Sequence, residues 1–279
     1  MSAGRTLLAI PVYNEAAHLQ TVLSHARHYV SDILVIDDGS TDDTPRLLAL
    51  ETRLTVIQHR RNLGYGQSLA DAFEHAIQAG YDWLITMDCD WQHEPSHIPE
   101  FIAAAQTDRW DIVSGSRYLA DAADQSVAPA DRRAINHQIT ALLNDRLGLH
   151  LTDAFCGFKA YRVAGLRSLR ITVPGYAMPL QLWVQAWRAG LRISELPIRL
   201  IYNDPNRHFG GELDDPAARL SHYLATLNAE LEAVDASGPP VSVAAWLPTT
   251  GPSSDPAVPC GESSHSVDAA PCCRPPVCD

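Results

Sequence analysis

Short apolar runs and amphipathic stretches alternate along the first ninety residues of the chain. Runs of mostly apolar residues, each followed by a polar loop, are typical of buried parallel strands and occupy residues 7–12, 33–36, 54–57 and 83–87. Between them, apolar side chains recur at helical spacing, as in residues 19–26 and 69–77. This alternation predicts right-handed crossovers and a Rossmann-like α/β architecture, a mostly parallel sheet with helices on both faces.

After residue 110 the pattern is less regular but still mixed. A strand is expected over residues 112–118, and a helix from about Asp131 to near Gly148. The remaining elements are expected as a loop and strand at 153–161, a helix at 180–187, a strand at 192–202 and a last helix beginning at Asp215-Pro216. Pro197 places the strand at 192–202 at a sheet edge.

The composition changes near residue 235. Residues 1–234 carry the periodic apolar positions and are predicted to form one α/β domain. Residues 235–279 are rich in Pro, Ser, Ala and Cys, with few large apolar groups. Such a segment buries too little surface to offset its ordering entropy, so we expect a disordered tail.

Charge and composition exclude several classes of protein. Of 279 residues, 46% are hydrophobic, which is enough for a sizeable core, and the formal net charge of −12 argues against nucleic-acid binding. No apolar run reaches bilayer length, and no signal-like segment precedes the first strand. Before the tail, only Cys89 and Cys156 are present, which fits a reduced protein. We therefore expect a cytoplasmic protein, with at most peripheral contact at the inner membrane face.

The candidate chemistry begins at the end of the fourth apolar run. Asp88 and Asp90 follow it directly, at the sheet edge where ligands bind in open α/β sheets. Two carboxylates this close repel each other unless a cation lies between them. Mg²⁺ commonly combines one or two carboxylates with phosphate oxygens, and Gln92 adds a neutral oxygen. These residues predict a metal that holds a diphosphate; the alternative is a solvated Asp-x-Asp turn.

Three further loops follow predicted strands and carry polar side chains. They contain Tyr13 with Glu15, Asp37 with Asp38, and Arg117. Neither a dinucleotide-binding Gly-x-Gly-x-x-Gly nor a Walker A motif is present. A phosphate ligand would therefore be held by metal and arginine, and not by a glycine-rich cradle. Asp37 and Asp38 have an alternative reading as helix-capping acids.

Six ordered segments resemble glycosyltransferase family 2, which has the GT-A fold. Within that family, the chain is most similar to the branch of dolichyl- or polyprenyl-phosphate mannosyltransferases. The segments read PVYNE at 11–15, VIDDGSTD at 35–42, NLGYG at 62–66, DCDWQH at 88–93, GSRY at 115–118 and DAFCGFKAYR at 153–162. The resemblance covers roughly residues 5–200 and implies an inverting, metal-dependent hexosyltransferase. Its donor would be a nucleotide-diphosphate sugar of the GDP-mannose or UDP-glucose type, and its acceptor a polyprenyl phosphate or a glycan.

The resemblance also implies a role for each matching residue. The nucleotide pocket would be lined by Pro11, Tyr13, Glu15 and Asp38, with Asp37 supporting its loop. Mg²⁺ or Mn²⁺ would be bound by Asp88, Asp90 and Gln92. Arg117 would face the transferred sugar or the acceptor phosphate, Arg132 or Arg133 would meet an acceptor phosphate, and Arg207 would contact the donor.

The acceptor decides whether a general base is needed. A phosphate oxygen is already an anion at pH 7, whereas a hydroxyl must lose a proton to a carboxylate. Asp153 is the candidate base, with a structural turn as its alternative role. A catalytically silent nucleotide-sugar-binding scaffold is the competing function. A nucleotidyltransferase would show a Gly-rich loop with Arg and Lys after the first strand, and residues 11–17 contain none.

Overall fold

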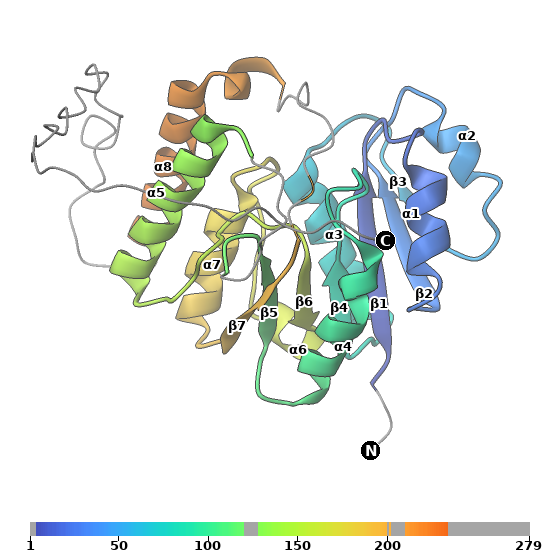
Figure 1. The fold of residues 1–279 in the computed structure, drawn as a ribbon, viewed down its shortest axis with the longest axis horizontal. Coiled ribbons are helices and arrows are strands. Elements are labelled where there is room, and N and C mark those ends of the chain that lie inside the picture. Colours follow the sequence, from blue (N-terminus) through green and yellow to red (C-terminus); the bar gives the residue numbers. More distant parts are fainter. Residues whose placement is uncertain (1–3, 120–127, 200, 202–209, 234–279) are drawn as a thin grey trace, which may run out of the picture. The chain divides into compact units, whose positions relative to one another are not determined.

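The computed structural model describes residues 4–119, 128–199, 201 and 210–233. It contains one seven-stranded sheet with the order β3-β2-β1-β4-β6-β5-β7 (Figure 1). The strands are β1 (Thr6–Val12), β2 (Asp32–Asp37), β3 (Thr55–Gln58), β4 (Trp83–Thr86), β5 (Ile112–Ser116), β6 (Lys159–Arg162) and β7 (Ile193–Pro197). The α-helices are α1 (Leu19–Ala26), α2 (Thr44–Leu48), α3 (Tyr65–Gln78), α4 (Ile98–Gln106), α5 (Ala130–Leu147), α6 (Val163–Leu166), α7 (Met178–Arg188) and α8 (Pro216–Ala233), with 3-10 turns η1 (Pro95–His97) and η2 (Gly211–Asp214).

The sheet is mostly parallel, as the sequence predicted. Strand β1 pairs in parallel with β2 and β4, β2 with β3, and β5 with β7. Strand β6 is the exception, because it lies antiparallel between β4 and β5. Strand β7 ends at Pro197 and occupies an edge of the sheet, as expected from the missing N–H of proline.

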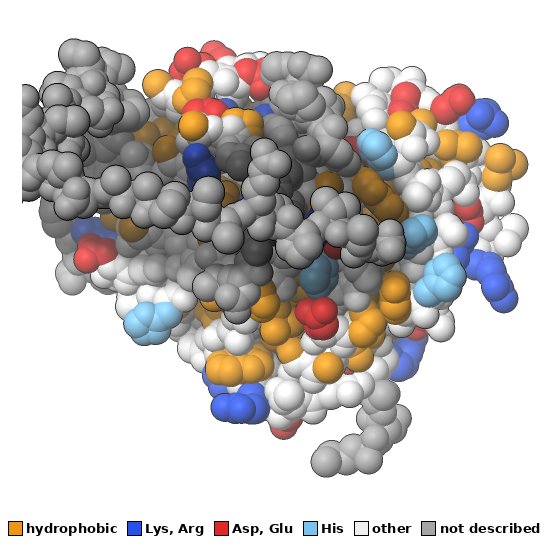
Figure 2. Space-filling model, viewed as in Figure 1, with side chains coloured by type: hydrophobic (Ala, Val, Ile, Leu, Met, Phe, Trp, Pro, Cys, Tyr) orange, Lys and Arg blue, Asp and Glu red, His pale blue; other side chains and the backbone are white. Residues whose placement is uncertain are grey.

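Helices cover both faces of the sheet, and the strands β1, β2 and β4, which are buried on both faces, read as continuous apolar runs. Along β1, Leu7 and Ala9 join the apolar cluster built with α3, α5, α7 and α8. The alternate residues Leu8 and Ile10 join the cluster built with α1 and α4. The helices therefore fix the sheet from two sides and leave the strand ends for the site. On the described surface of the face that Figure 2 shows, acidic and basic side chains are scattered and do not gather by sign.

Helix ends follow the local signals. Gly148 ends α5 in the left-handed conformation, with φ 63°, and Gly80 follows α3 with φ 69°. Asp215 caps α8, because its Oδ1 accepts the N–H of Ala218 at 2.8 Å. None of the described helices is both long enough and apolar enough to cross a bilayer. The domain boundary near residue 234 stays a prediction, since residues 234–279 lie outside the described part of the chain.

Candidate active site

A cavity of about 830 Å³ opens beyond the carboxyl ends of β1, β2, β4 and β5. The predicted residues that line it are Pro11, Tyr13, Glu15, Asp38, Asp88, Asp90, Gln92, Arg117 and Arg132. Asp37 lies behind the wall, fully buried. Arg133 is exposed and is not a lining residue, because it sits one position along α5 from the inward-facing Arg132. Arg207 and its expected donor contact lie outside the described residues.

The loops after β1 and β2 are tied together by Asn14. Its backbone has φ 57°, its Oδ1 accepts the N–H of Thr41 at 2.8 Å, and its own N–H donates to Ser40 Oγ at 2.9 Å. Asp37 accepts the N–H of Ser40 at 3.0 Å and the Gln58 amide at 3.1 Å. Asp37 thus supports the loop through these two hydrogen bonds.

Asp38 connects the cavity wall to the Asn62–Gly66 segment. Its Oδ1 accepts the N–H of Leu63 at 2.8 Å, and its Oδ2 accepts the N–H of Gly64 at 2.9 Å. Two glycines let this segment pack closely on residues 173–175, since a Cβ on Gly64 would lie 2.3 Å from Pro174 O and one on Gly66 2.1 Å from Val173 O. The glycines of the Asn-Leu-Gly-Tyr-Gly motif therefore allow close backbone approach.

His59 is a residue that the sequence reasoning missed. Its ring nitrogens lie 2.7 Å from Asp38 Oδ1 and 2.7 Å from Asp71 Oδ2, and its side chain is 7% exposed. Burial alone would lower the pKa of His59, but the hydrogen bonds and charges of the two carboxylates outweigh burial and raise it. No local signal marks this bridge, because Asp71 comes from α3.

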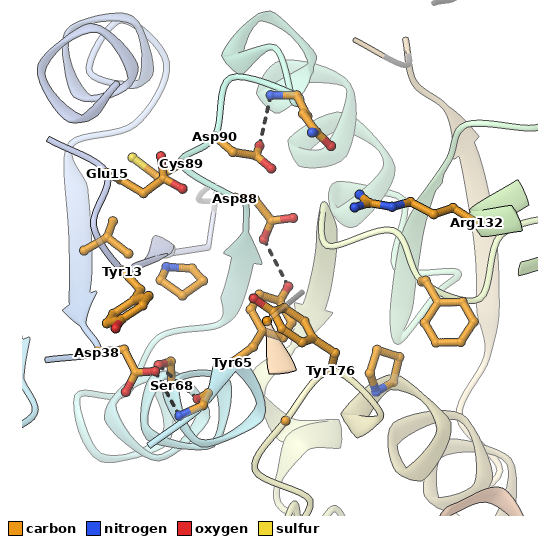
Figure 3. Close-up of a pocket in the computed structure, with 18 of the residues that line it drawn as sticks. Tyr13, Glu15, Asp38, Tyr65, Ser68, Asp88, Cys89, Asp90, Arg132 and Tyr176 are labelled. Carbon is orange, nitrogen blue, oxygen red and sulfur yellow. Dashed lines mark hydrogen bonds between the residues drawn. The ribbon is translucent and has the colours of Figure 1, made fainter. Parts of the chain in front are cut away.

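Asp88 is held from three directions. Its Oδ1 accepts the Tyr65 hydroxyl at 3.1 Å (Figure 3). Its backbone N–H donates to His93 Nδ1 at 3.3 Å. Because His93 Nδ1 accepts this bond, the proton of the neutral ring lies on Nε2, facing Cys156 Sγ at 3.9 Å. Burial lowers the pKa of His93, which favours this neutral form. Gly157 closes the third side, since a Cβ there would lie 2.4 Å from Asp88 Oδ2.

Asp90 and Gln92 stand in the same loop, and their donor set fits a hard divalent cation. Asp90 Oδ1 accepts the N–H of Gln92 at 3.0 Å. The Gln92 amide nitrogen is buried and has no hydrogen-bond partner among the described residues, so this side chain suits a polar ligand. The described part of the chain holds no cluster of three or more His, Cys, Asp or Glu side chains suited to a metal. Two carboxylates and one amide match Mg²⁺ or Mn²⁺ when phosphate oxygens supply further ligands.

Arg117 and Asp153 form a bidentate ion pair. Arg117 Nε lies 2.6 Å from Asp153 Oδ2 and Nη2 lies 2.9 Å from Oδ1, while Asn136 donates to Oδ1 at 2.8 Å. Burial alone would raise the pKa of Asp153, but the charge and hydrogen bonds of Arg117 hold it well below its usual range. Glu195 braces the pair, since its carboxylate accepts the N–H of Asp153 at 3.1 Å. A carboxylate with both oxygens engaged and a lowered pKa does not favour the general-base role expected for Asp153.

The opposite wall carries cations and aromatic rings. Arg132 points from α5 into the cavity, on the side facing Asp88 (Figure 3). Arg219 of α8 also lines the cavity and pairs with Asp131 at 2.6 Å. Tyr65 and Tyr176 stack with ring centroids 5.9 Å apart between the two walls. Arg219, Tyr65 and Tyr176 were not predicted from the sequence, because their place in the site depends on how distant segments pack.

This sheet, with an acid-bearing loop at its carboxyl edge facing arginines across one cavity, has the GT-A fold of nucleotide-sugar glycosyltransferases. It superposes on glucosyl-3-phosphoglycerate synthase of Mycobacterium tuberculosis with a TM-score of 0.62 over 82% of this chain and 81% of that chain, at 21% identity. That protein has also been solved with Mn²⁺, UDP and glucosyl-3-phosphoglycerate, and that structure gives the same TM-score at 22% identity, over 82% of this chain and 80% of that one.

The chain belongs to glycosyltransferase family 2 and is a glycosyltransferase. Residues 8–170 match the family model "Glycosyl transferase family 2". The undecaprenyl-phosphate mannosyltransferase of Micrococcus luteus is 32% identical over 206 residues, 71% of this chain and 84% of that protein. The polyprenol monophosphomannose synthase of Mycolicibacterium smegmatis is 29% identical, over 70% of this chain and 76% of that protein. These relatives match the dolichyl- and polyprenyl-phosphate branch expected from the motifs.

Proposed function

We propose that this glycosyltransferase moves a hexose from a nucleotide-diphosphate sugar to a polyprenyl phosphate, with inversion at the anomeric carbon and dependence on Mg²⁺ or Mn²⁺. A glycan hydroxyl is the other acceptor that the resemblance implies. The names of the relatives favour mannose as the sugar and therefore GDP-mannose as the donor, with UDP-glucose next.

The opposed charges of the cavity carry this proposal. Glu15, Asp38, Asp88 and Asp90 line one side, Arg132 reaches in from the other (Figure 3), and Arg117 is a further lining residue. A metal-bound diphosphate suits the acidic side, and a second phosphate suits the arginines. A reaction that transfers a sugar from a nucleotide diphosphate to a lipid phosphate needs the diphosphate site and the acceptor-phosphate site within reach of that sugar.

The chemistry follows from these placements. Asp88, Asp90 and Gln92 would hold the divalent ion, which when bound offsets the negative charge that develops on the leaving diphosphate. Arg117, held rigidly by Asp153, adds positive charge without moving during the reaction. An acceptor phosphate attacks as an anion, so no carboxylate has to take a proton, which agrees with the engaged state of Asp153.

Membrane contact is part of the proposal, since a polyprenyl phosphate resides in a lipid bilayer. The described helices include no candidate span, so the chain would reach this acceptor from the bilayer surface. Vesicles with and without polyprenyl phosphate would test this contact by co-sedimentation.

The deciding experiment has two stages. The first is a melting-temperature panel with GDP, UDP, ADP and CDP, each with and without Mn²⁺; a ligand at a hundredfold excess over its Kd adds about 2.7 kcal/mol of stability. The second measures transfer of labelled mannose from GDP-mannose, or glucose from UDP-glucose, to polyprenyl phosphate. A metal-dependent shift with no transfer to any acceptor would support the silent scaffold, and no shift with any nucleotide would remove the donor assignment.

A further inference from the structure

The loop that carries Asp90 contains a tryptophan in an unusual backbone conformation. Trp91 has φ 60°, in the left-handed region where a bulky side chain crowds its own backbone. The other described non-glycine residues with positive φ are Asn14 and Asp108, two types that tolerate this region. A large residue persists in such a conformation where surrounding contacts hold it there.

His25 of α1 provides one such contact. Its ring meets the Trp91 ring edge to face, with centroids 5.1 Å apart and planes at 82°. Trp91 also packs against the apolar cluster that holds α1 on the sheet. Helix α1 is itself fixed by Leu19, Val22 and Leu23, all fully buried. The indole therefore contacts helix α1, which is itself packed firmly on the sheet.

The left-handed turn at Trp91 sets the orientation of its two neighbours. Trp91 stands between Asp90 and Gln92, and the Gln92 N–H donates to Asp90 Oδ1 at 3.0 Å. Both side chains line the cavity. Because Trp91 lies between these two groups, the contacts that hold it also restrict the backbone from which both side chains project.

We propose that Trp91 is a positioning residue for the metal loop, and that His25 is the partner through which α1 holds it. The pair keeps Asp90 and Gln92 oriented for a divalent cation before any ligand arrives, so that binding does not have to order the loop. This inference rests on the proposed function, because it assigns the residues that shape the proposed metal site.

The test measures Mn²⁺ affinity without turnover. Free Mn²⁺ is followed by electron paramagnetic resonance in the presence of whichever nucleoside diphosphate, GDP or UDP, stabilises the wild-type chain. Trp91→Ala and His25→Ala are each expected to raise the Mn²⁺ Kd about two- to tenfold, the range expected for losing one aromatic contact. The double variant should lose no more than the greater single loss, since both changes remove the same contact.

Two further variants separate the effect of the Trp91 ring contact from the backbone conformation of residue 91 and from general effects of substitutions near α1. Trp91→Gly relieves the strained backbone but lacks the ring, so it should bind Mn²⁺ as weakly as Trp91→Ala. His28→Ala removes another exposed histidine near the end of α1, whose ring lies 6.4 Å from that of His25, and should leave the Mn²⁺ Kd unchanged. Because His25 is exposed, His25→Ala should keep the ligand-free melting temperature and so report on the loop alone.

Each outcome either supports or overturns the positioning role of Trp91 and His25. Wild-type affinity in His25→Ala, full affinity in Trp91→Gly, or additive losses in the double variant would overturn the proposal. Failure of the wild-type chain to bind Mn²⁺ with either nucleotide would instead overturn the proposed function, and the inference with it; that result is visible before any variant is compared.

Discussion

The ion pair between Arg117 and Asp153 allows a prediction that separates a structural role from a catalytic one. Asp153 is fully buried, and the Arg117 side chain is 19% exposed. Breaking a buried pair by removing one charge costs about 3–5 kcal/mol. Because Arg117 keeps some contact with water, we expect Asp153→Asn to lose about 3 kcal/mol of unfolding free energy. For a domain of this size that loss lowers Tm by about 6–12 °C.

The pH dependence of this loss has a defined sign. The pKa of Asp153 is depressed in the folded chain, so the pair adds stability above the ordinary carboxyl pKa of about 4 and loses it as pH falls below that value. The gap in unfolding free energy between wild type and Asp153→Asn should therefore be full at pH 7 and shrink below about pH 4.

Urea unfolding followed by circular dichroism at pH 7 and in the acid range measures both effects. Asp43→Asn is the matched control, since it removes an acid from the exposed pair with Arg46 and should cause no measurable loss. Asp153→Asn that keeps wild-type stability at pH 7 but loses turnover would refute this reasoning and restore the general-base role. Parallel stability curves for wild type and variant across the acid range would refute it as well.

Three further predictions concern the cavity. Asp90→Ala should abolish metal-dependent turnover while circular dichroism and melting show an intact fold, and turnover at the wild-type rate would remove the metal assignment. Gly157→Ala should leave stability nearly unchanged but weaken Mn²⁺ binding, measured by resonance titration, because the new methyl displaces the Asp88 carboxylate; unchanged affinity would show that Asp88 is not a ligand. The raised pKa of His59 means that its stabilising contribution is complete below about pH 6.5 and is lost as pH rises through the folded pKa. Urea unfolding between pH 6 and 9 should show this slope in wild type and not in His59→Gln, and equal slopes would contradict it.

The first four strands of the sheet were predictable from residue order alone. The apolar runs at 7–12, 33–36, 54–57 and 83–87 mark β1 to β4 within one or two residues. For β1, β2 and β4 the reason is burial on both faces, whereas β3 is a largely exposed edge strand. The antiparallel direction of β6 was not predicted, since periodicity carries no information about which way a strand runs. Its pairing with β4 depends on contacts between segments more than seventy residues apart.

The residues of the candidate site also divide into those that the sequence predicts and those that depend on tertiary packing. Asp88 and Asp90 were found from sequence because they immediately follow a strand, and strand ends meet at one edge. Arg132 and Arg133 could not be separated, because only the rotation of α5 decides which one faces the cavity. His59 and Arg219 gave no signal, since their partners Asp71 and Asp131 lie on other elements whose packing decides the contact.

The place of β6 in the sheet has a consequence for how the chain matures. During synthesis, β1 to β4 emerge well before residue 159, so β4 then has an open edge made of Trp83 to Thr86, all apolar or buried in the finished domain. An uncovered apolar edge invites pairing with another nascent chain. Gly157, which confines Asp88, arrives with the same late strand. The loop from Asp88 to Gln92 can therefore take its final shape only after residue 157 has left the ribosome. Ribosome-bound chains that end before β6 should aggregate and should not bind Mn²⁺ at the proposed metal site.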